Sequence, residues 1–224
     1  MTNVHAFAFN PFSENTYLVY DDSQECLIID PGCYTASERQ QLHDFIAQQQ
    51  LKPVRLINTH CHIDHVLGNR YVAETYGLEL EIHQGELPVL ETVPMVAQMY
   101  GIPNIQQSPD PNPERYLQEG DFITFGNSQL KILLTPGHSP ASVSFYCEAS
   151  KFVIGGDVLF QGSIGRTDLP GGNHSTLMES IEREFMSLPD DTVVYAGHGP
   201  ATTVGKERQS NPFILEYNTY KKNQ

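Results

Sequence analysis

The chain of 224 residues is 39% hydrophobic and 18% charged, which is ordinary for a globular protein that buries a substantial core. Its 27 acidic residues outnumber its 13 Lys and Arg, so the formal net charge is −14 at pH 7. Proteins that bind nucleic acid rely on clustered Lys and Arg to neutralise phosphates. The basic residues form no run here, and we therefore expect no nucleic-acid partner.

The sequence has none of the features of an exported or membrane-spanning protein. No apolar stretch approaches the length of a membrane span, and residues 1–7 lack the basic start and apolar core of a signal peptide. The four cysteines lie far apart and form no C-x-x-C pair, which favours free thiols in a reducing compartment. We expect a cytoplasmic protein without a membrane partner.

Short strands and two helices are expected in the first third of the chain. Apolar patterning predicts strands at residues 4–9, 16–20, 25–29, 54–58 and 78–82. Ser37 is expected to cap the first helix, with Gln40 at the capping-box position. A second, shorter helix is expected over residues 69–76, where Gly77 ends it.

Residues 84–118 differ in composition from the rest of the chain. They hold several prolines, including Pro109, Pro111 and Pro113. Such a composition predicts an insertion made of a helical piece and a stiff loop. We expect it to be either a lid or substrate wall, or a decoration of the surface.

The second half of the chain repeats the order of strands followed by a helix. Strands are expected at residues 123–124, 130–134, 142–146, 152–154 and 192–195. A helix is expected from about residue 175 to 186, with Asn173 near its N-cap. No linker separates the halves, so we predict one domain over residues 1–224, with two sheets and helices outside them.

The run Thr59-His60-Cys61-His62-Ile63-Asp64-His65 places four potential metal ligands within six residues, directly after an expected strand. Imidazole nitrogen and carboxylate oxygen suit zinc or a similar first-row metal. His60 and His62 alternate as on an extended strand end, while Asp64 and His65 follow where the chain turns. One ion could therefore bind the first pair and a second ion the last pair, and two adjacent metals are typical of hydrolases. The Cys61 side chain is expected to point away and pack in the interior.

Three further candidate ligands follow other expected strands. His138 lies in Thr135-Pro136-Gly137-His138, Asp157 in Gly155-Gly156-Asp157, and His198 in Ala196-Gly197-His198-Gly199-Pro200. Each stands beside a glycine, which allows the backbone to turn sharply or to approach an ion closely. A strand end also positions a side chain rigidly. Three such positions together with the His-rich run indicate a metal site.

These motifs resemble the metallo-β-lactamase superfamily, and the resemblance extends from Asn15 to about Asn211. It implies an α/β fold, a four-layer αββα sandwich with the metal site at one edge of the two sheets. It also implies two groups of metal ligands and one bridging residue. His60, His62 and His138 would bind the first metal, Asp64, His65 and His198 the second, and Asp157 both.

Single residues indicate which group of enzymes within this superfamily the chain resembles. Penicillin-cleaving members carry cysteine at the position of Asp157 and are exported, and redox-active diiron members carry glutamate at the position of His62. Mononuclear persulfide dioxygenases share much of the pattern, including residues 165–168, but differ at residues 197–200. The full ligand set, and the lack of the C-terminal helical extension of longer members, resemble the short glyoxalase II-like enzymes, the hydroxyacylglutathione hydrolases.

The resemblance implies a mechanism and supporting residues. A metal-bridging hydroxide would attack a thioester carbonyl, because two metals lower the pKa of bound water toward about 7. Asp64 would hold its metal and orient the nucleophile, and Asp30 would orient ligand histidines through their other ring nitrogen. Arg166, at the position of a glutathione-binding lysine, would bind a substrate carboxylate, although a salt bridge with Asp168 would also explain it. Pro200 and Asp168 replace the two tyrosines of the longer enzymes.

The expected cofactors are two divalent metal ions, zinc first, with iron or manganese as alternatives. The expected partner is a small-molecule thioester, S-lactoylglutathione or a related acyl-thiol, and a homodimer is left open. The alternative function is that of a persulfide dioxygenase with one iron at His60, His138 and Asp157. A closed metal-binding scaffold, a nuclease and a β-lactamase are less favoured.

Overall fold

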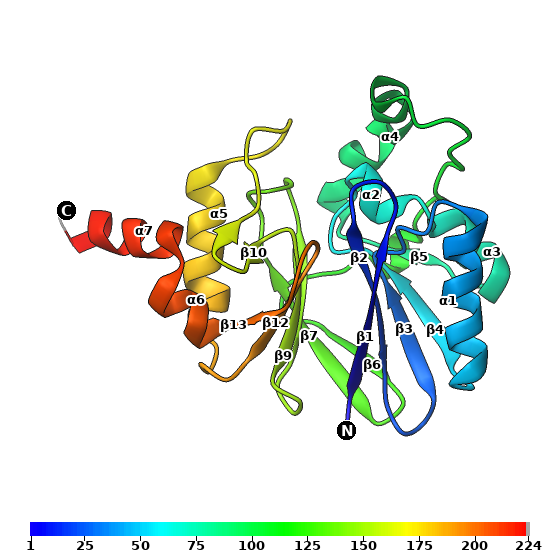
Figure 1. Ribbon diagram of the computed structural model, residues 1–224, viewed down its shortest axis with the longest axis horizontal. Helices are drawn as coiled ribbons and strands as arrows, with labels where there is room; N and C mark the ends of the chain where they lie inside the picture. Colours follow the sequence, from blue (N-terminus) through cyan, green and yellow to red (C-terminus); the bar gives the residue numbers. More distant parts are fainter. Residues whose placement is uncertain (223–224) are drawn as a thin grey trace.

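Two sheets pack face to face with helices on both outer faces, as Figure 1 shows for the computed structural model, which describes residues 1–222. The first sheet has the order β1 (Asn3–Phe9), β2 (Glu14–Tyr20), β3 (Glu25–Ile29), β4 (Lys52–Ile57) and β5 (Leu80–Glu81). The second has the order β13 (Thr202–Thr203), β12 (Val193–Ala196), β9 (Phe152–Gly156), β8 (Val143–Cys147), β7 (Ser128–Leu134) and β6 (Phe122–Phe125). A separate hairpin joins β10 (Leu159–Phe160) and β11 (Ser163–Ile164). The predicted αββα sandwich, a single α/β domain, is confirmed.

The helices divide between the two outer faces (Figure 1). The first sheet is covered by α1 (Ala36–Gln48) and α3 (Asn69–Tyr76). The second sheet is covered by α5 (His174–Ser180) and α6 (Val204–Ser210), while α7 (Pro212–Lys222) extends away from the sandwich. Two further helices, α2 (Ile63–Val66) and α4 (Leu87–Tyr100), lie at the end of the first sheet shown at the top of the figure.

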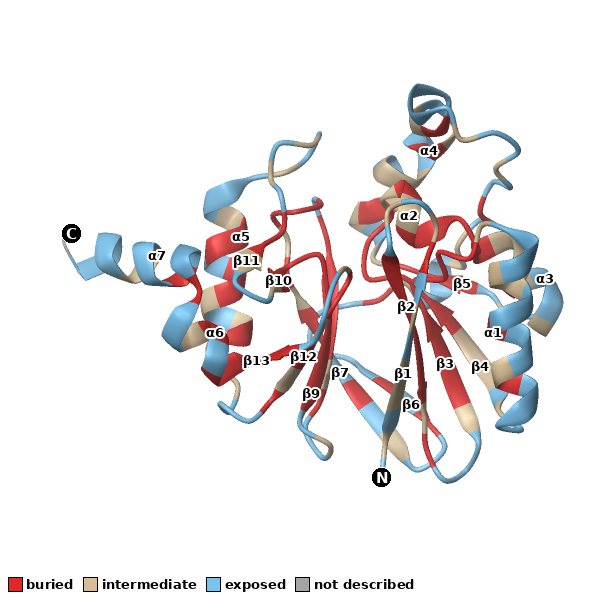
Figure 2. Ribbon diagram, in the orientation of Figure 1, coloured by how far each residue is buried: buried red, intermediate tan, exposed pale blue. Residues whose placement is uncertain are grey.

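Alternating side chains on the central strands separate three apolar layers. In β2, Leu18 packs on the helix side of the first sheet, whereas Tyr17 and Val19 point between the two sheets. In β9, Val153 packs under the outer helices of the second sheet, and its neighbour Ile154 points inward. Strands buried on both faces therefore read as nearly continuous apolar runs. Figure 2 shows this burial along the central strands of both sheets.

The N-cap of the first helix lies two residues earlier in the chain than predicted. Thr35 is the N-cap: its Oγ1 accepts a hydrogen bond from Glu38 N at 3.2 Å, and the Glu38 carboxylate accepts from Thr35 N at 2.7 Å. Ser37 and Gln40 therefore lie inside the helix, not at its cap. The reason is tertiary, since Glu38 also accepts from the backbone of Asn10 at 2.6 Å and so joins the helix start to the β1–β2 loop.

The expected helix over about 175–186 is interrupted. Asn173 caps it as predicted, accepting from Thr176 N at 2.9 Å. The α-helix ends at Ser180, however, and Ile181–Phe185 continue as a π-helical turn closed by a hydrogen bond from Met186 N to Ile181 O at 2.9 Å. The helix over Asn69–Tyr76 is confirmed, with Gly77 at its end in the left-handed conformation (φ 67°).

Residues 84–118 begin with the 3₁₀ turn η1 (Gln84–Glu86), continue as α4 and include a second 3₁₀ turn, η2 (Pro113–Arg115). The helix α4 ends at Gly101, whose φ of 64° reverses the chain. The expected helical piece and loop are thus present, while the insertion and its role as a lid stay predictions. Within residues 1–222, no helix combines the length and apolar character of a membrane span.

Candidate metal centre

Seven potential ligand side chains meet at one edge of the two sheets, the edge at which α2 lies in Figure 1. They come from the loop after β4, from α2, from the β7–β8 loop and from the ends of β9 and β12. Their residues, in that order, are His60 and His62, Asp64 and His65, His138, Asp157, and His198. The parallel pairing of β9 with β12 places the last two side by side, because Gly197 N donates to Gly156 O at 2.8 Å.

The first three-residue ligand group consists of His60, His62 and His138. One ring nitrogen of each lies within 4.8 Å of the other two. His62 Nδ1 is 2.8 Å from His138 Nε2. Three imidazole nitrogens this close together can bind one metal ion.

The second group consists of Asp64, His65 and His198, again with ligand atoms within 4.8 Å of one another. Asp64 Oδ2 lies 3.1 Å from His198 Nε2 and 3.7 Å from His65 Nε2. The short helix α2 carries the first two of these side chains. This group can bind a second ion through two nitrogens and one oxygen.

Asp157 lies between the two groups. Its Oδ2 is 3.4 Å from His138 Nε2 and 3.6 Å from His198 Nε2, and its Oδ1 is 3.5 Å from His65 Nε2. One carboxylate therefore contacts a histidine of the first group and both histidines of the second. A carboxylate in this position can contact metal ions held by either group.

Hydrogen bonds to the second ring nitrogen set the orientation of four of the histidines. His60 Nδ1 bonds Thr59 Oγ1 at 3.1 Å, His65 Nδ1 bonds Asp30 Oδ2 at 3.1 Å, and His138 Nδ1 donates to the Arg166 carbonyl at 2.7 Å. His198 Nδ1 donates to the Phe12 carbonyl at 3.1 Å. In each ring this leaves Nε2 as the nitrogen that faces the centre, which is how proteins commonly orient metal-binding histidines.

Asp30 forms buried hydrogen bonds with residues of the centre. It is buried, and its left-handed backbone (φ 50°) is unusual for a residue other than glycine. Its carboxylate accepts from Thr59 N at 2.7 Å and Thr59 Oγ1 at 2.5 Å and bonds His65 Nδ1. Its oxygens also lie near His60 and His65 as a third candidate ligand group, but these hydrogen bonds occupy them. Asp30 is thus placed to orient ligands, as the sequence suggested.

The charges of the first ligand group and of Asp157 suit metal binding. Burial, followed by the nearby His65, lowers the pKa of His60 well below its ordinary value, and burial with His138 lowers that of His62 to about 4. Burial would raise the pKa of Asp157, but His65 and His138 outweigh it and hold this pKa below its usual range. Neutral imidazoles and ionised carboxylates are the forms that bind metals.

In the second ligand group, carboxylates shift the pKa of the histidines the other way. Burial would lower the pKa of His65 and His198, but Asp64 and Asp157 outweigh burial and raise it. These two rings would therefore have to release a proton to bind a metal.

Three buried polar atoms of the centre have no hydrogen-bond partner among residues 1–222: His60 Nε2, His65 Nε2 and Asp157 Oδ1. Leaving such atoms unpaired in the interior is unfavourable by about 1–3 kcal/mol each. All three face the two groups, and nitrogen and carboxylate oxygen are ligands of zinc, iron and manganese. The residues present therefore fit a centre of two metal ions.

Glycine at position 197 allows the close approach of the two strand ends. A Cβ atom there would lie 2.1 Å from Asp157 Oδ1 and 2.8 Å from His65 Cε1. Any larger residue would have to displace both side chains. The glycine beside His198 thus has a steric function in the centre.

Glu86 is a buried residue of the centre that the sequence analysis missed. Its Oε2 accepts from Cys61 N at 2.9 Å, its Oε1 accepts from Ala141 N at 2.8 Å, and Ser139 Oγ donates to the carboxylate at 2.7 Å. These partners neighbour His60, His62 and His138. Cys61 itself is buried among apolar side chains on the helix side of the first sheet, as expected. A lone glutamate in the segment 84–118 carries no sequence pattern that would reveal this contact.

Asn15 and Tyr17 hold the loop that carries His198. Asn15 Nδ2 donates to Ala196 O at 3.0 Å and Gly199 O at 2.8 Å, and Tyr17 Oη donates to Ala196 O at 2.6 Å. In sequence, residues 15–17 resemble a superfamily stretch near the site, but a turn at the strand entry explains Asn15 equally well. The partners of Asn15 and Tyr17 lie about 180 residues away in the chain, at separations of 179 to 184 positions, which no local pattern reports.

Arg166 lies beside the centre but does not point a free charge into it. Its side chain is exposed and donates two hydrogen bonds to Asp168, at 2.7 and 2.8 Å. The bond to Arg166 holds the pKa of the Asp168 carboxyl at about 2. The salt bridge considered as the alternative for this residue is therefore present, and the Arg166 carbonyl also orients His138.

The model of the Metallo-beta-lactamase superfamily matches residues 9–198. The chain belongs to the metallo-β-lactamase superfamily. Hydroxyacylglutathione hydrolase GloC of Haemophilus influenzae is 36% identical to this chain over 214 residues. The match covers 95% of this chain and 98% of GloC. Metal-ligand groups of His and Asp in the structure agree with the divalent-metal chemistry of the superfamily.

Two solved structures have the same fold as this chain and are more than 30% identical to it in sequence. A structure named as the BLEG-1 B3 metallo-beta-lactamase superposes with a TM-score of 0.85 and 34% identity, covering 95% of this chain and 99% of the other. TTHA1623 in a di-iron-bound form superposes with a TM-score of 0.83 and 37% identity, covering 93% and 99%. The comparisons thus include proteins named for different reactions and one named for iron.

Proposed function

We propose that this protein is a binuclear metal-dependent hydrolase of a thioester, S-lactoylglutathione or a related acyl-thiol. The observation that carries the proposal is the position of Asp157 between two ligand groups, with contacts of 3.4 to 3.6 Å to histidines of both. Two adjacent ions are the arrangement of many hydrolases. The similarity to GloC over nearly the full length of both chains supports the choice of a thioester.

In this proposal, His60, His62 and His138 hold one ion and Asp64, His65 and His198 the other, with Asp157 shared between them. Zinc is the proposed metal because its ligands are nitrogen and oxygen, with iron and manganese as alternatives. When bound there, two divalent ions polarise a carbonyl and lower the pKa of coordinated water toward about 7.

The residues of the chain orient the attacking water, the ligands and the substrate. Asp64, whose Oδ2 faces the centre 3.1 Å from His198 Nε2, is the proposed catalytic carboxylate that orients the attacking water. The water gives up one proton as its oxygen adds to the thioester carbonyl carbon, the carbon–sulfur bond breaks, and the thiolate that leaves takes up that proton, which gives a carboxylic acid and a thiol. Asp30 keeps the His65 ring in one orientation throughout. Arg166 is the proposed cation for a substrate carboxylate and would have to exchange its bond with Asp168.

A second candidate is β-lactam hydrolysis, which the similarity to the structure named BLEG-1 B3 metallo-beta-lactamase favours. The same centre would serve, because both reactions add water to an acyl carbon that bears a leaving group. The two candidates differ in the group that leaves, a thiolate or a ring amide nitrogen.

The test is metal quantification combined with a substrate panel. The purified chain is stripped with a chelator, reloaded with zinc, iron or manganese, and assayed on S-lactoylglutathione, a second acyl thioester, a penicillin and a cephalosporin. We expect two ions per chain and cleavage of at least one thioester, with loss of activity after chelation. A single iron with thiol-dependent oxygen uptake on a persulfide would overturn the proposal in favour of a dioxygenase, and cleavage of β-lactams alone would favour the second candidate.

A further inference from the structure

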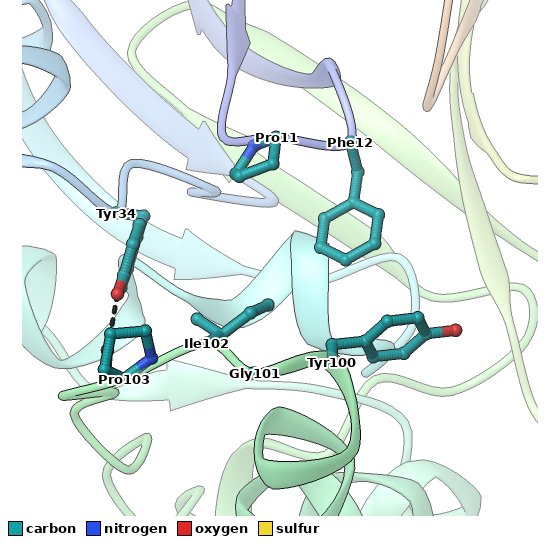
Figure 3. Close-up of a pocket in the computed structure, with 7 residues that line it drawn as sticks. All are labelled: Pro11, Phe12, Tyr34, Tyr100, Gly101, Ile102 and Pro103. Carbon is teal, nitrogen blue, oxygen red and sulfur yellow. Dashed lines mark hydrogen bonds between the residues drawn. The ribbon is translucent and has the colours of Figure 1, made fainter.

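An apolar pocket lies between the β1–β2 loop and the C-terminal end of α4, outside the group of seven ligands (Figure 3). Its volume is about 360 Å³. Uncharged residues line it throughout: Pro11, Phe12, Tyr34, Tyr100, Gly101, Ile102 and Pro103. Pockets that bind small molecules have volumes of about 300–1,000 Å³ and mostly apolar walls, so this pocket can hold an aromatic ring or a short alkyl chain.

The pocket walls are held in place by contacts between segments far apart in the sequence. The rings of Phe12 and Tyr100 pack edge to face with centroids 5.4 Å apart. On the opposite side, the Tyr34 hydroxyl donates a hydrogen bond to the Pro103 carbonyl, as the dashed line in Figure 3 shows. Tyr100 is 54% exposed, so the pocket opens to solvent along this ring.

The β1–β2 loop is shared between the pocket and the candidate metal centre. The Phe12 carbonyl accepts from His198 Nδ1 at 3.1 Å, while the Phe12 ring lines the pocket. Asn10 Nδ2, two residues earlier, donates to the Asp64 carbonyl at 2.9 Å. The pocket therefore lies on the side of the second ligand group, separated from His198 by a single residue of the loop.

We propose that this β1–β2/α4 pocket binds an apolar substituent of the thioester, either its acyl chain or an apolar part of its thiol. The inference rests on the proposed thioester hydrolysis and adds the class of substrate. Glutathione carries two carboxylates, and a pocket of uncharged residues in a chain of net charge −14 offers no cation to bind them. Arg166, the proposed cation for a substrate carboxylate, does not line this pocket.

The first test is a chain-length series on the metal-loaded protein. One series extends the acyl group from acetyl to octanoyl on a neutral thiol, N-acetylcysteamine, and the other keeps the acetyl group and extends an alkyl thiol. Because each buried methylene contributes about fourfold to an equilibrium, kcat/KM is expected to rise by about this factor per methylene until the pocket is filled. The series that shows the rise identifies which substituent occupies the pocket, and a flat response in both would overturn the proposal.

Substitutions of pocket residues test whether the pocket causes the dependence of kcat/KM on chain length. Tyr100→Ala and Ile102→Ala are each expected to reduce the gain between the shortest and longest substrate by about tenfold, and Tyr100→Phe should keep it. Met99→Ala is the matched control, since Met99 precedes Tyr100 on α4, is 78% exposed and does not line the pocket. An equal loss in Met99→Ala, or no loss in both pocket variants, would contradict the assignment.

A binding measurement separates this proposal from the hydrolase assignment. The hexyl and methyl thioethers of N-acetylcysteamine, which cannot be hydrolysed, are titrated into metal-free protein by calorimetry. We expect the hexyl probe to bind more tightly and to lose about tenfold in affinity in Tyr100→Ala. If this holds while no thioester is cleaved, the hydrolase assignment falls and the apolar pocket stands. If thioesters are cleaved but hexyl and methyl probes bind equally, the pocket proposal falls and the hydrolase assignment stands.

Discussion

The buried carboxylate of Glu86 accepts a hydrogen bond from the backbone amide of Cys61 at 2.9 Å. Cys61 stands between two candidate ligands, His60 and His62, and the same carboxylate accepts from Ser139, the neighbour of His138. One side chain at the base of the segment 84–118 therefore joins the two loops that supply the first ligand group. This contact gives the segment a role in the centre that does not depend on its acting as a lid.

The substitution Glu86→Gln should weaken metal binding at the first ligand group. All three partners of Glu86 are donors, so the amide nitrogen of glutamine would face a donor and leave it unpaired, at about 1–3 kcal/mol. We expect a loss of about tenfold or more in the affinity for one of two zinc ions, measured by competition with a chromogenic chelator.

Glu207→Gln is the matched control for this prediction. Glu207 is as buried as Glu86 and accepts from Gly162 N at 2.7 Å and Asn211 Nδ2 at 2.9 Å, away from the ligand loops. Its substitution should lower the unfolding free energy but leave both zinc affinities unchanged. If the two variants lose zinc equally, Glu86 acts through general stability and not through the ligand loops.

Asp30→Asn tests the orientation of His65. The carboxylate bonds His65 Nδ1 and two donors of Thr59, and removing such a partner typically reduces metal affinity or activity by about 10- to 100-fold. We expect this loss in a zinc competition assay and in thioester turnover. Asp44→Asn, on the exposed face of α1, should change neither. Wild-type zinc affinity in Asp30→Asn would rule out the proposed role.

Gly197→Ala should disrupt the centre without any change of charge. The added Cβ would lie 2.1 Å from Asp157 Oδ1, so the shared carboxylate must move. We expect the variant to bind fewer than two zinc ions by elemental analysis. Gly199→Ala is the comparison: its left-handed backbone (φ 70°) makes alanine unfavourable by about 1–2 kcal/mol, yet no atom lies within 4 Å of the added Cβ. That variant should be less stable but retain both ions.

The stability of the fold should depend on Asp21 at acidic pH. Burial tends to raise the pKa of this carboxyl, but hydrogen bonds from Ser23, Ser128 and the Asn127 amide outweigh burial and lower it. A lowered pKa in the folded state stabilises the protein above the unfolded value of about 3.9, and this stabilisation disappears as pH falls through the folded value.

Asp21→Asn should therefore be less stable than the wild type at pH 6, by about 1–2 kcal/mol in urea unfolding. The difference should begin to shrink at about pH 4, where the carboxyl of the unfolded chain takes up a proton, and should disappear as pH falls through the lower pKa of the folded state. Asp22→Asn should show little effect at either pH, because Asp22 is exposed and its one ion pair within residues 1–222 is with the N-terminus, at 3.4 Å. A difference that persists unchanged to pH 3 would show that the ionised carboxylate is not responsible.

The sequence predicted most of the fold because its signals are local. Short apolar runs marked the long strands, Gly77 and Asn173 marked helix ends, and the strand-end positions of His138, Asp157 and His198 pointed to one edge. These signals depend only on neighbours in the chain. The same is true of the run from His60 to His65, whose four candidate ligands lie within six residues.

The remaining features depend on contacts between distant segments. Thr35, and not the predicted Ser37, caps α1 because Glu38 also bonds the β1–β2 loop. The two-residue strands β10, β11 and β13 form only through pairing with their partner strands. Glu86 and Asn15 support the centre through residues 25 and more than 180 positions away, respectively. The sequence left two roles open for Arg166, and the fold of its loop places the side chain against Asp168.

In the proposed function, catalysis requires two ions held by ligand groups that share Asp157. The most direct test is a titration of metal-free protein with zinc, following thioester cleavage and bound metal in the same samples. We predict that activity reaches its plateau at two equivalents per chain, and that Asp157→Ala no longer binds the second ion and loses turnover. A plateau at one equivalent, with full activity and no further binding, would contradict the binuclear account.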